Sequence, residues 1–394
     1  DVCSSDLGDT GIINNGENLF VVENTFKIGE YVLHFGILER GVIEVNNEVR
    51  MNVNEEHRKG CARNHTATHL LNAALTSVLG IVNQTSSSVQ PDHLKFEFQS
   101  YQGMLTPEQV MAIEEKVNEV IRVALPIVIQ KVKLSDACQQ PDITLMPYEK
   151  YPSVVRVVNV LGTECNSGYV YKDEIDFCSR ELCCGTHSLN TADLQQFIIT
   201  SVTTPHQKTL RSTRCIRAVT GDIALQVVNQ TACLKQTVDQ MNAHFKKLKK
   251  KVQDVALDDI DESFKKLQKV KSVLRTTDIQ AVARISIEAI LNDCEKVYDS
   301  LLRKCAIKQF KEAQEPGHMT YYVDILCGTH SGAGVSNVGK KIISLCSIPS
   351  MVFMHTKEGF LRGRCLFPKN LENEKFNAKS WTDHVAMAMN GEGL

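Results

Sequence analysis

One long stretch of the 394-residue chain lacks both residues that most often interrupt helices. No proline or glycine occurs between Asp222 and Glu315. Apolar residues recur there at steps of three and four, first at Leu234, Val238, Met241, Phe245, Leu248 and Val252. Two further stripes follow, at Phe264, Leu267, Val270 and Leu274, and less regularly at Ile285, Ile290, Val297 and Leu301. This spacing predicts a helical, coiled arm over residues 222–315 that separates two other parts of the chain.

The first part of the chain begins with short segments typical of strands. Branched and aromatic residues gather at 19–22, 31–36 and 42–45, and asparagine and glycine punctuate the chain between them. Several short strands joined by regular turns predict a small β-barrel, to which we assign residues 8–58.

Residues 59–221 mix helical and strand patterns, which predicts an α+β domain. Strands are expected at 94–98, 154–160 and 197–200, and a loop at 82–89. Thr106 and Gln109 have the spacing of a capping box, and Pro107 suits the first position of a helix. A helix is therefore expected to begin at this point.

Two segments of this α+β domain carry histidine and cysteine at regular spacings. His65 and His69 are four residues apart in a run of helix formers, so both imidazoles would project from one face of a helix. Cys183 and His187 add a thiolate and a third imidazole. Such a ligand set suits Zn2+. Either pair alone also fits ordinary histidines, but the two pairs together favour a metal site.

The flanks of both pairs resemble the editing domain of alanyl-tRNA synthetases. The first segment reads Asn64-His65-Thr66-Ala67-Thr68-His69-Leu70-Leu71, and the second reads Glu181-Leu182-Cys183-Cys184-Gly185-Thr186-His187. The family patterns NH(S/T)ATHLL and ELC(G)GTH are almost intact. Free-standing trans-editing proteins and threonyl-tRNA synthetases have similar domains. Cys184 replaces the usual glycine, as in the animal mitochondrial alanyl form, and the resemblance runs from about Gly8 to the last residue.

The resemblance implies a hydrolase that removes serine or glycine wrongly attached to tRNA(Ala). Zinc would be held by His65, His69, Cys183 and His187. Thr66, Gln84 and Cys183 are the candidate catalytic residues, with ordinary helix and loop polarity as the alternative role for Thr66 and Gln84. Four protein ligands close a tetrahedral zinc, so either one of them, such as Cys183, is loosely held, or the metal orients the substrate.

Residues 316–394 return to alternating strand and helix patterns, which predicts an α/β domain. Strands are expected at 319–323 and 351–354, and a helix around 339–343. Cys327-Gly328-Thr329-His330 imitates the second metal pair, but its spacing differs and it has no nearby partner pair, so we expect no metal there. In the family this region binds tRNA and supports dimers. The resemblance thus implies tRNA(Ala) as a partner, with the protein a homo-oligomer through this region or a monomer.

Charge and hydropathy restrict the partners of the chain. The formal net charge is -2, so RNA would be held by local patches. The dense basic run at 246–251 is either a solvated helix face or a contact for tRNA phosphate. No apolar run approaches the ~20 residues of a membrane span, so no membrane partner is expected. The resemblance to the animal mitochondrial form favours the mitochondrial matrix, with the cytoplasm as the alternative.

The sequence at both ends bears on which protein this is. Residues 1–7 fit no hydrophobic period and are interpreted as a non-native leader, and 389–394 are expected to be cut off within a glycine-rich stretch. Three interpretations compete: a fragment of an alanine–tRNA ligase whose ATP-using aminoacylation domain lies upstream, a free-standing trans-editing deacylase, and a non-catalytic tRNA-binding module with a structural zinc. The long arm and the C-terminal domain favour the fragment.

Overall fold

A computed structural model describes residues 8–28, 31–101, 103–140, 143–145, 150–161, 175, 177–204, 213–250, 257–314, 320–330, 332–368, 370–372 and 377–388. The expected leader at 1–7 and the expected cut at 389–394 lie outside these residues. The chain divides into two compact units. The first runs to Ala232 and includes Asp278–Arg284, and the second contains Cys233–Thr277 and the chain from Ile285 onward.

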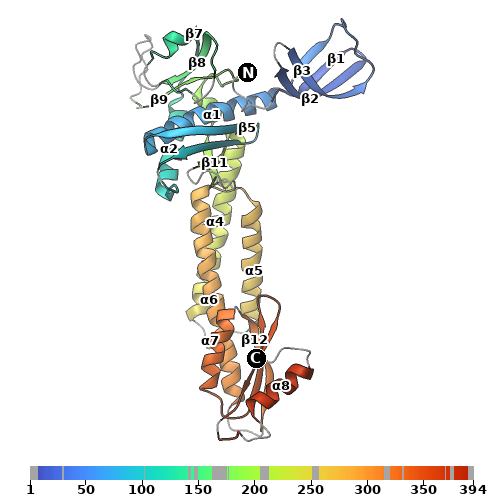
Figure 1. Cartoon of the computed structure of the whole chain (residues 1–394), viewed down its shortest axis with the longest axis vertical. Helices are drawn as coiled ribbons and strands as arrows, with labels where there is room; N and C mark the ends of the chain where they lie inside the picture. The colour runs from blue at the N-terminus through green and yellow to red at the C-terminus, as the bar shows by residue number, and fades with distance from the viewer. Residues whose placement is uncertain are drawn as a thin grey trace. The chain divides into compact units, whose positions relative to one another are not determined.

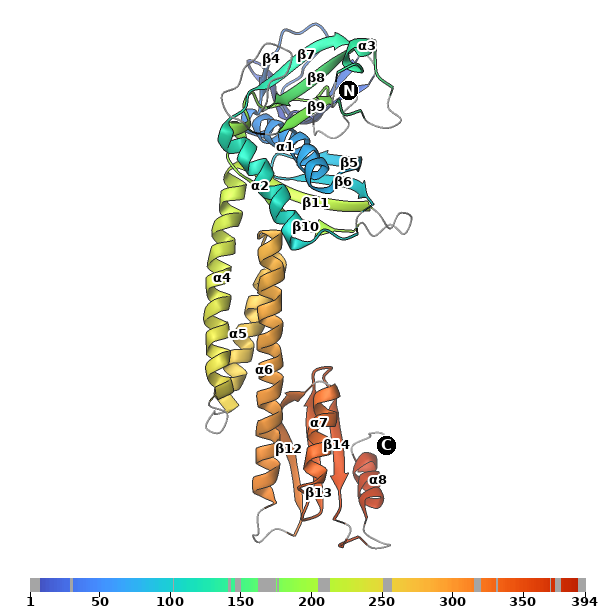
Figure 2. The same ribbon diagram turned by 90° about the vertical axis from the view of Figure 1, so that its left-hand side faces the viewer.

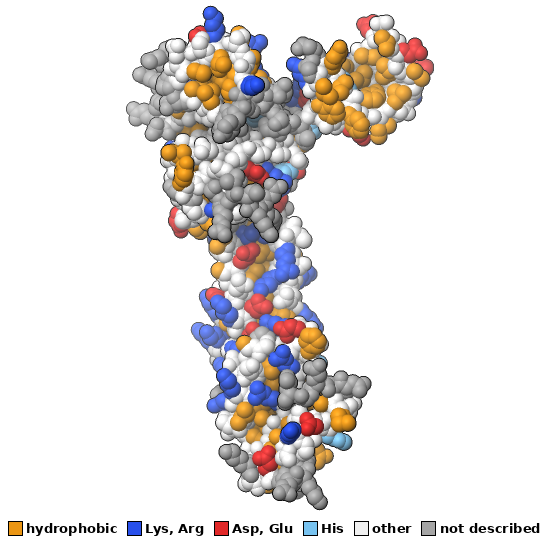
Figure 3. Space-filling model, viewed as in Figure 1, with side chains coloured by type: hydrophobic (Ala, Val, Ile, Leu, Met, Phe, Trp, Pro, Cys, Tyr) orange, Lys and Arg blue, Asp and Glu red, His pale blue; other side chains and the backbone are white. Residues whose placement is uncertain are grey.

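The first unit begins with a four-stranded antiparallel sheet, drawn in blue in Figure 1. It contains β1 (Gly11–Asn15), β2 (Asn18–Ile28), β3 (Tyr31–Arg40) and β4 (Arg50–Val53), in the order β3-β2-β1-β4. The described strands form an open sheet with β3 and β4 at its edges, where we expected a closed barrel. Many apolar side chains of this sheet are exposed (Figure 3), including Phe26, Ile28, Tyr31, Val32 and Phe35.

The prediction of a strand at 42–45 is wrong. These residues lead into a turn, in which the Glu44 amide donates to Asn47 Oδ1 and the Asn47 amide donates to the Glu44 carbonyl. Asn46 takes a positive φ of 70° in this turn, a conformation that asparagine tolerates better than most residues. The fourth strand instead forms at β4, where residues 50–53 pair with β1.

Helix α1 (Glu55–Leu79) carries the first histidine pair, as predicted. It begins where the Asn54 side chain accepts a hydrogen bond from the His57 amide, with Glu55 and Glu56 in the first turn facing the positive end of the helix dipole. It ends at Gly80, which has a φ of 81°. Every residue from 64 to 72 is buried, so this stretch of the helix is covered on all sides.

A second antiparallel sheet has the order β10-β11-β6-β5. Its strands are β5 (Val82–Val89), β6 (Leu94–Ser100), β10 (Phe197–Thr203) and β11 (Thr213–Thr220). Helices α1 and α2 (Pro107–Val123) pack with it around one core that includes Leu70, Phe96, Ile113, Val117 and Ile199 (Figure 2). The capping box of Thr106 and Gln109 is confirmed.

The prediction of a loop at 82–89 is wrong, because this segment is strand β5. Its Asn-Gln-Thr-Ser-Ser-Ser sequence has no apolar alternation. The segment pairs through its backbone with β6 at the edge of the sheet, and most of its side chains remain at least partly exposed. Backbone hydrogen bonds to the neighbouring strand can therefore stabilise an edge strand whose polar side chains give no sequence signal of a strand.

A third sheet, ordered β7-β8-β9, completes the first unit. It contains β7 (Ile127–Lys133), β8 (Val154–Leu161) and β9 (Cys178–Leu182), with the short α3 (Leu134–Ala137) beside it. The strand predicted at 154–160 is confirmed as β8. Strand β9 leads directly into Cys183, and the turn η1 (Thr191–Leu194) follows the second metal pair.

The predicted helical arm consists of α4 (Gly221–Lys250), α5 (Leu257–Thr276) and α6 (Ala281–Ala313). The first two stripes are confirmed where they are described, with Val238, Phe245 and Leu267 almost fully buried, and Val252 lies outside the described residues. The third stripe is right at Leu301, which is buried, and wrong at Ile285, which is exposed. The buried residues of α6 are Ile287, Leu291, Cys294, Tyr298, Leu301, Leu302, Ala306 and Phe310. Tyr298 stacks on Phe264 with a centroid distance of 4.1 Å, which fixes the face of α6 that turns inward.

The last part of the second unit is α/β, as predicted. Strands β12 (Tyr322–His330) and β13 (Ser350–Thr356) are parallel, and β14 (Leu361–Leu366) pairs antiparallel with β13. Helix α7 (Gly332–Ile343) connects the parallel pair, as a crossover requires, and α8 (Ala378–Ala388) follows β14. None of the helices in the described part of the chain is long and apolar enough to cross a membrane.

Candidate metal centre

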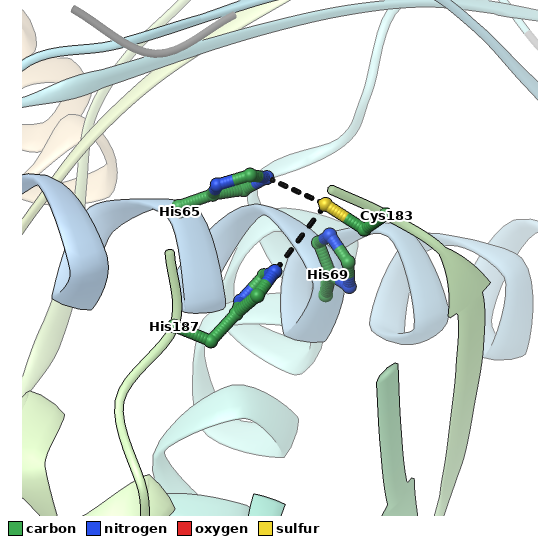
Figure 4. Close-up of side chains that lie close together, drawn as sticks. All are labelled: His65, His69, Cys183 and His187. Carbon is green, nitrogen blue, oxygen red and sulfur yellow. Dashed lines mark hydrogen bonds between the residues drawn. The ribbon is translucent and has the colours of Figure 1, made fainter. Parts of the chain in front are cut away.

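The four residues of the two sequence pairs meet in the first unit (Figure 4). His65 and His69 lie one turn apart on α1, with ring centroids separated by 5.2 Å. The segment after β9 brings Cys183 and His187 to the same place. One ligand atom from each of the four residues lies within 4.8 Å of the others, so the predicted set is assembled.

The thiol of Cys183 lies between two imidazoles. Its Sγ atom is 3.3 Å from His65 Nε2 and 3.3 Å from His187 Nε2. The bond lengths of a tetrahedral zinc would place a sulfur and a nitrogen ligand ~3.5 Å apart. A thiol has one proton and can donate it to only one of these nitrogens. A cation accepting lone pairs from all four groups satisfies the cluster better than hydrogen bonding does.

The protonation of the histidines suits metal binding. Burial, and then the charge of the neighbouring His65, lowers the pKa of His69 well below its ordinary value. Burial also lowers the pKa of His187, with smaller contributions from His69, His65 and Arg156. Neutral imidazoles keep the lone pair that a metal requires.

Oxygen atoms lie near the outward nitrogens of two of these rings. The Thr66 hydroxyl is 3.2 Å from His187 Nδ1 and accepts a hydrogen bond from the Ser188 amide at 3.1 Å. Metal-bound histidines commonly use their second nitrogen in such a bond, which fixes the ring orientation. Thr66 therefore holds His187 in place from the neighbouring helix.

The second ring nitrogen of His69 has less complete hydrogen bonding. Its Nδ1 atom is buried and has no hydrogen-bond partner among the described residues, and Glu181 Oε2 lies 3.6 Å away. Asn72 donates to the other oxygen of this carboxylate at 3.0 Å. A small rotation of the ring would bring Nδ1 within hydrogen-bond distance of Glu181, as in carboxylate–histidine–metal arrangements. The orphaned nitrogen is thus an observation that fits a bound metal.

Arg156 on β8 holds the segment that carries the second pair. Its Nη1 atom donates to the carbonyls of Cys184, at 2.5 Å, and Gly185, at 3.2 Å. The Arg156 carbonyl also accepts a hydrogen bond from the Cys183 amide at 3.1 Å. Three contacts from one residue therefore set the path of the chain between Cys183 and His187.

Asn64 of the first motif anchors α1 next to the site. Its side chain donates to the Gln90 carbonyl and accepts from the Thr220 hydroxyl, both at 2.7 Å. Thr68 donates to the His65 carbonyl at 2.7 Å. Hydrogen bonds within α1 and from α1 to Gln90 and Thr220 thus hold this part of the helix in place.

The candidate catalytic residues are placed differently from one another. Cys183 belongs to the cluster and Thr66 contacts it through His187, and both residues are buried. Gln84 is half-buried on β5, where its Nε2 atom donates to the Ser87 hydroxyl at 3.1 Å. Among the described residues, no hydrogen bond joins Gln84 to the four ligands. The roles of Thr66, Gln84 and Cys183 in catalysis remain predictions.

The sequence reasoning missed Arg156, Asn72 and Glu181 as supporting residues. Glu181 stands inside the second motif, which is a signal of a role near the metal. Arg156 lies in an ordinary strand pattern and Asn72 in an ordinary helix pattern, so neither carries a local signal. A cavity of about 480 Å³ is lined in part by Asn72, Glu181, Ser179 and Lys116, which leaves open space beside the Glu181 carboxylate.

Three imidazoles and one thiol, with Thr66, Glu181 and Arg156 beside them, form a cluster that could hold one metal ion, and zinc accepts such a donor set. The Cys327–His330 segment lies in β12, and among the described residues it belongs to no such cluster. No protein-family model matches the chain.

Curated proteins similar to this chain are alanine–tRNA ligases. The chain is 34% identical over 298 residues to an alanine–tRNA ligase of Thermoanaerobacter sp. (strain X514), covering 74% of this chain and 31% of that protein. It is 29% identical over 361 residues to the mitochondrial alanine–tRNA ligase of Drosophila melanogaster, covering 89% and 33%. A Fervidobacterium nodosum alanine–tRNA ligase is 39% identical over 217 residues, covering 55% and 22%. The chain is therefore homologous to the alanine–tRNA ligases, which are aminoacyl-tRNA ligases, and spans a third or less of the length of these relatives.

Proposed function

We propose that this chain is the editing part of an alanine–tRNA ligase and hydrolyses seryl-tRNA(Ala) and glycyl-tRNA(Ala). The observation that carries the proposal is the meeting of His65, His69, Cys183 and His187 around one point, with Cys183 Sγ 3.3 Å from two imidazole nitrogens. The site lies in a chain homologous to ligases for alanine.

The chemistry of alanine selection explains why such a site is needed. A binding pocket for alanine rejects glycine or serine poorly, because one methyl or hydroxyl group changes binding by only ~1–3 kcal/mol. A second, hydrolytic site then removes the wrong amino acid. The ester bond to tRNA is reactive, so orientation of water and ester and stabilisation of the oxyanion supply most of the required catalysis.

The residues of the site have different roles in this reaction. When bound, the metal would supply positive charge that orients and polarises the substrate. Thr66 holds His187, Glu181 faces His69, and Arg156 fixes the segment between Cys183 and His187. Cys183 is buried between two histidines, which favours an orienting role for the closed four-ligand set.

Partners, cofactors and location follow from the relatives as proposals. Zinc is the proposed resident metal and tRNA(Ala) the proposed partner. ATP belongs to the attachment of alanine, which we assign to the portion of the relatives that this chain does not match. The animal relative carries the word mitochondrial in its name, so we propose the mitochondrial matrix as the location, with the cytoplasm as the alternative. A homo-oligomer through residues 316–394, or a monomer, is retained as a proposal.

The test follows ester loss from preformed seryl-tRNA(Ala) and alanyl-tRNA(Ala) mixed with the purified chain. Faster loss of the seryl ester, abolished by Cys183→Ala, is the expected result. Cys184→Ala changes an adjacent, exposed thiol and serves as the matched control. Ester loss at the spontaneous rate, with zinc bound in full, would instead favour a tRNA-binding module with a structural metal.

A further inference from the structure

The second unit contains a small cavity in which half of the lining residues are lysines. Residues of α4 and α6 enclose about 130 Å³, and the lining consists of Lys249, Lys296, Val297, Ser300, Leu301 and Lys304. Three lysines thus line the cavity, and no carboxylate is among the described residues that line it. Its volume equals that of about four water molecules, which suits a phosphate group.

The three lysines are weakly neutralised by the protein. Lys296 pairs with Asp293 at 2.8 Å, but both side chains are largely exposed, and such pairs contribute little. Lys249 and Lys304 form no ion pair with any residue in the described part of the chain. Two of the three charges are therefore available to an external anion.

Helix stability explains only part of this cluster. Lys249 lies in the last turn of α4, where a cation interacts favourably with the negative end of the helix dipole. Lys296 and Lys304 are in the interior of α6, far from either end of a helix that runs from residue 281 to 313. The dipole effect is confined to the terminal turns, so it does not account for their placement.

The surroundings extend the positive surface. Lysine and arginine gather over α4, α5 and α6 (Figure 3), whereas the whole chain has a net charge of -2. Lys246, Lys247 and Lys250 lie on the same end of α4 as Lys249, and all are exposed. A row of cations on a chain without overall positive charge is the pattern of a local polyanion contact.

We propose that the cleft formed by Lys249, Lys296 and Lys304 binds a phosphodiester group of an RNA backbone, held by the three ammonium groups and the Ser300 hydroxyl. This inference rests on the proposed tRNA partner and adds to it a contact site on the helical arm. Lysine binds phosphate as a point charge and reads no sequence, so the cleft positions the RNA and does not select it.

The test measures binding of uncharged tRNA(Ala) to the full chain at several salt concentrations. A variant with Lys249→Gln, Lys296→Gln and Lys304→Gln is compared with Lys265→Gln, Lys266→Gln and Lys269→Gln, which removes the same charge from exposed positions of α5. The cleft variant should lower the slope of log affinity against log salt by about 2–3, and the α5 variant by less than ~1. Circular dichroism checks that both variants keep their helices.

Several outcomes would overturn the inference. Equal losses in both variants would mean general electrostatic attraction, and an unchanged slope in the cleft variant would remove the cleft from the interface. Inorganic triphosphate is the second probe: if the cleft substitutions abolish its binding but leave that of tRNA intact, the anion is a small polyphosphate. Uncharged tRNA carries no ester, so the result is independent of the editing proposal.

Discussion

Cys183 Sγ lies 3.3 Å from His65 Nε2, although 118 residues separate the two in the chain. The contact joins the end of β9 to the middle of α1, and His187 completes it at the same distance from the sulfur. Residues of α1 and of the second and third sheets share one core. The candidate metal centre is therefore a product of that packing, and substitutions can test each part of it separately.

The first prediction concerns metal content. The purified chain should contain one zinc ion, and His69→Ala or Cys183→Ala should lose most of it, because three protein ligands rarely retain a structural site. Elemental analysis measures this directly. Cys327→Ala and His330→Ala alter the similar segment in β12 and should leave the zinc content unchanged. A His69→Ala, Cys183→Ala double variant with full zinc would contradict the assignment.

The second prediction concerns Thr66. Thr66→Val keeps the shape of the side chain but removes the oxygen next to His187 Nδ1 and the acceptor for the Ser188 amide. Loss of these contacts should weaken zinc binding about 10-fold or more and reduce stability by about 1 kcal/mol. Competition with a chelator and denaturant unfolding measure the two effects. Thr66→Ser should restore both, and normal zinc affinity in Thr66→Val would limit Thr66 to a role in substrate recognition.

The third prediction concerns Arg156. Arg156→Gln shortens the donor that reaches the Cys184 and Gly185 carbonyls, so the segment between Cys183 and His187 should lose its fixed path. Zinc affinity should fall about 10–100-fold, as it does when supporting residues of metal sites are removed. Arg122→Gln, which breaks an exposed ion pair with Glu115, is the matched control and should bind zinc normally. Equal zinc affinity in both variants would show that the loop is held by other contacts.

The fourth prediction concerns the pH dependence of stability at Glu114. Burial raises the pKa of this carboxyl, although the Ile199 amide and the Gln280 side chain donate to it and act in the opposite direction. The folded chain therefore binds the Glu114 proton more tightly than the unfolded chain, and its contribution to stability is lost as pH rises from about 4.5 through the folded pKa. Glu114→Gln removes this titration and should gain stability relative to the unmodified chain over that range.

Denaturant midpoints measured from pH 4.5 to 7.5 test the prediction for Glu114. Glu115→Gln is the control, because Glu115 is the exposed neighbour and pairs with Arg122 at the surface. The pH dependence of the midpoint should change more in Glu114→Gln than in Glu115→Gln. If the difference between Glu114→Gln and the unmodified chain does not vary with pH, burial does not perturb this carboxyl in solution.

Much of the helical structure was available from the sequence alone. The capping box at Thr106, the histidine spacing on α1 and the stretch without proline or glycine from Asp222 to Glu315 all predicted helices that the structure confirms. These signals work because a helix is stabilised by contacts between residues three or four apart, which the local sequence records.

The ligand set was also predicted from the sequence, since each pair lies within five consecutive residues and matches a family pattern. The tertiary structure decided what depends on distant partners: strand β5 in a polar segment, the inward face of α6, and the contacts of Arg156, Asn72 and Glu181. Strand pairing and the hydrogen bonds that orient metal ligands join groups far apart in the chain. Neither produces a periodic pattern in the sequence of the residues that take part. The sequence named the four ligands, and packing of α1 against the end of β9 brought them within 4.8 Å of one another.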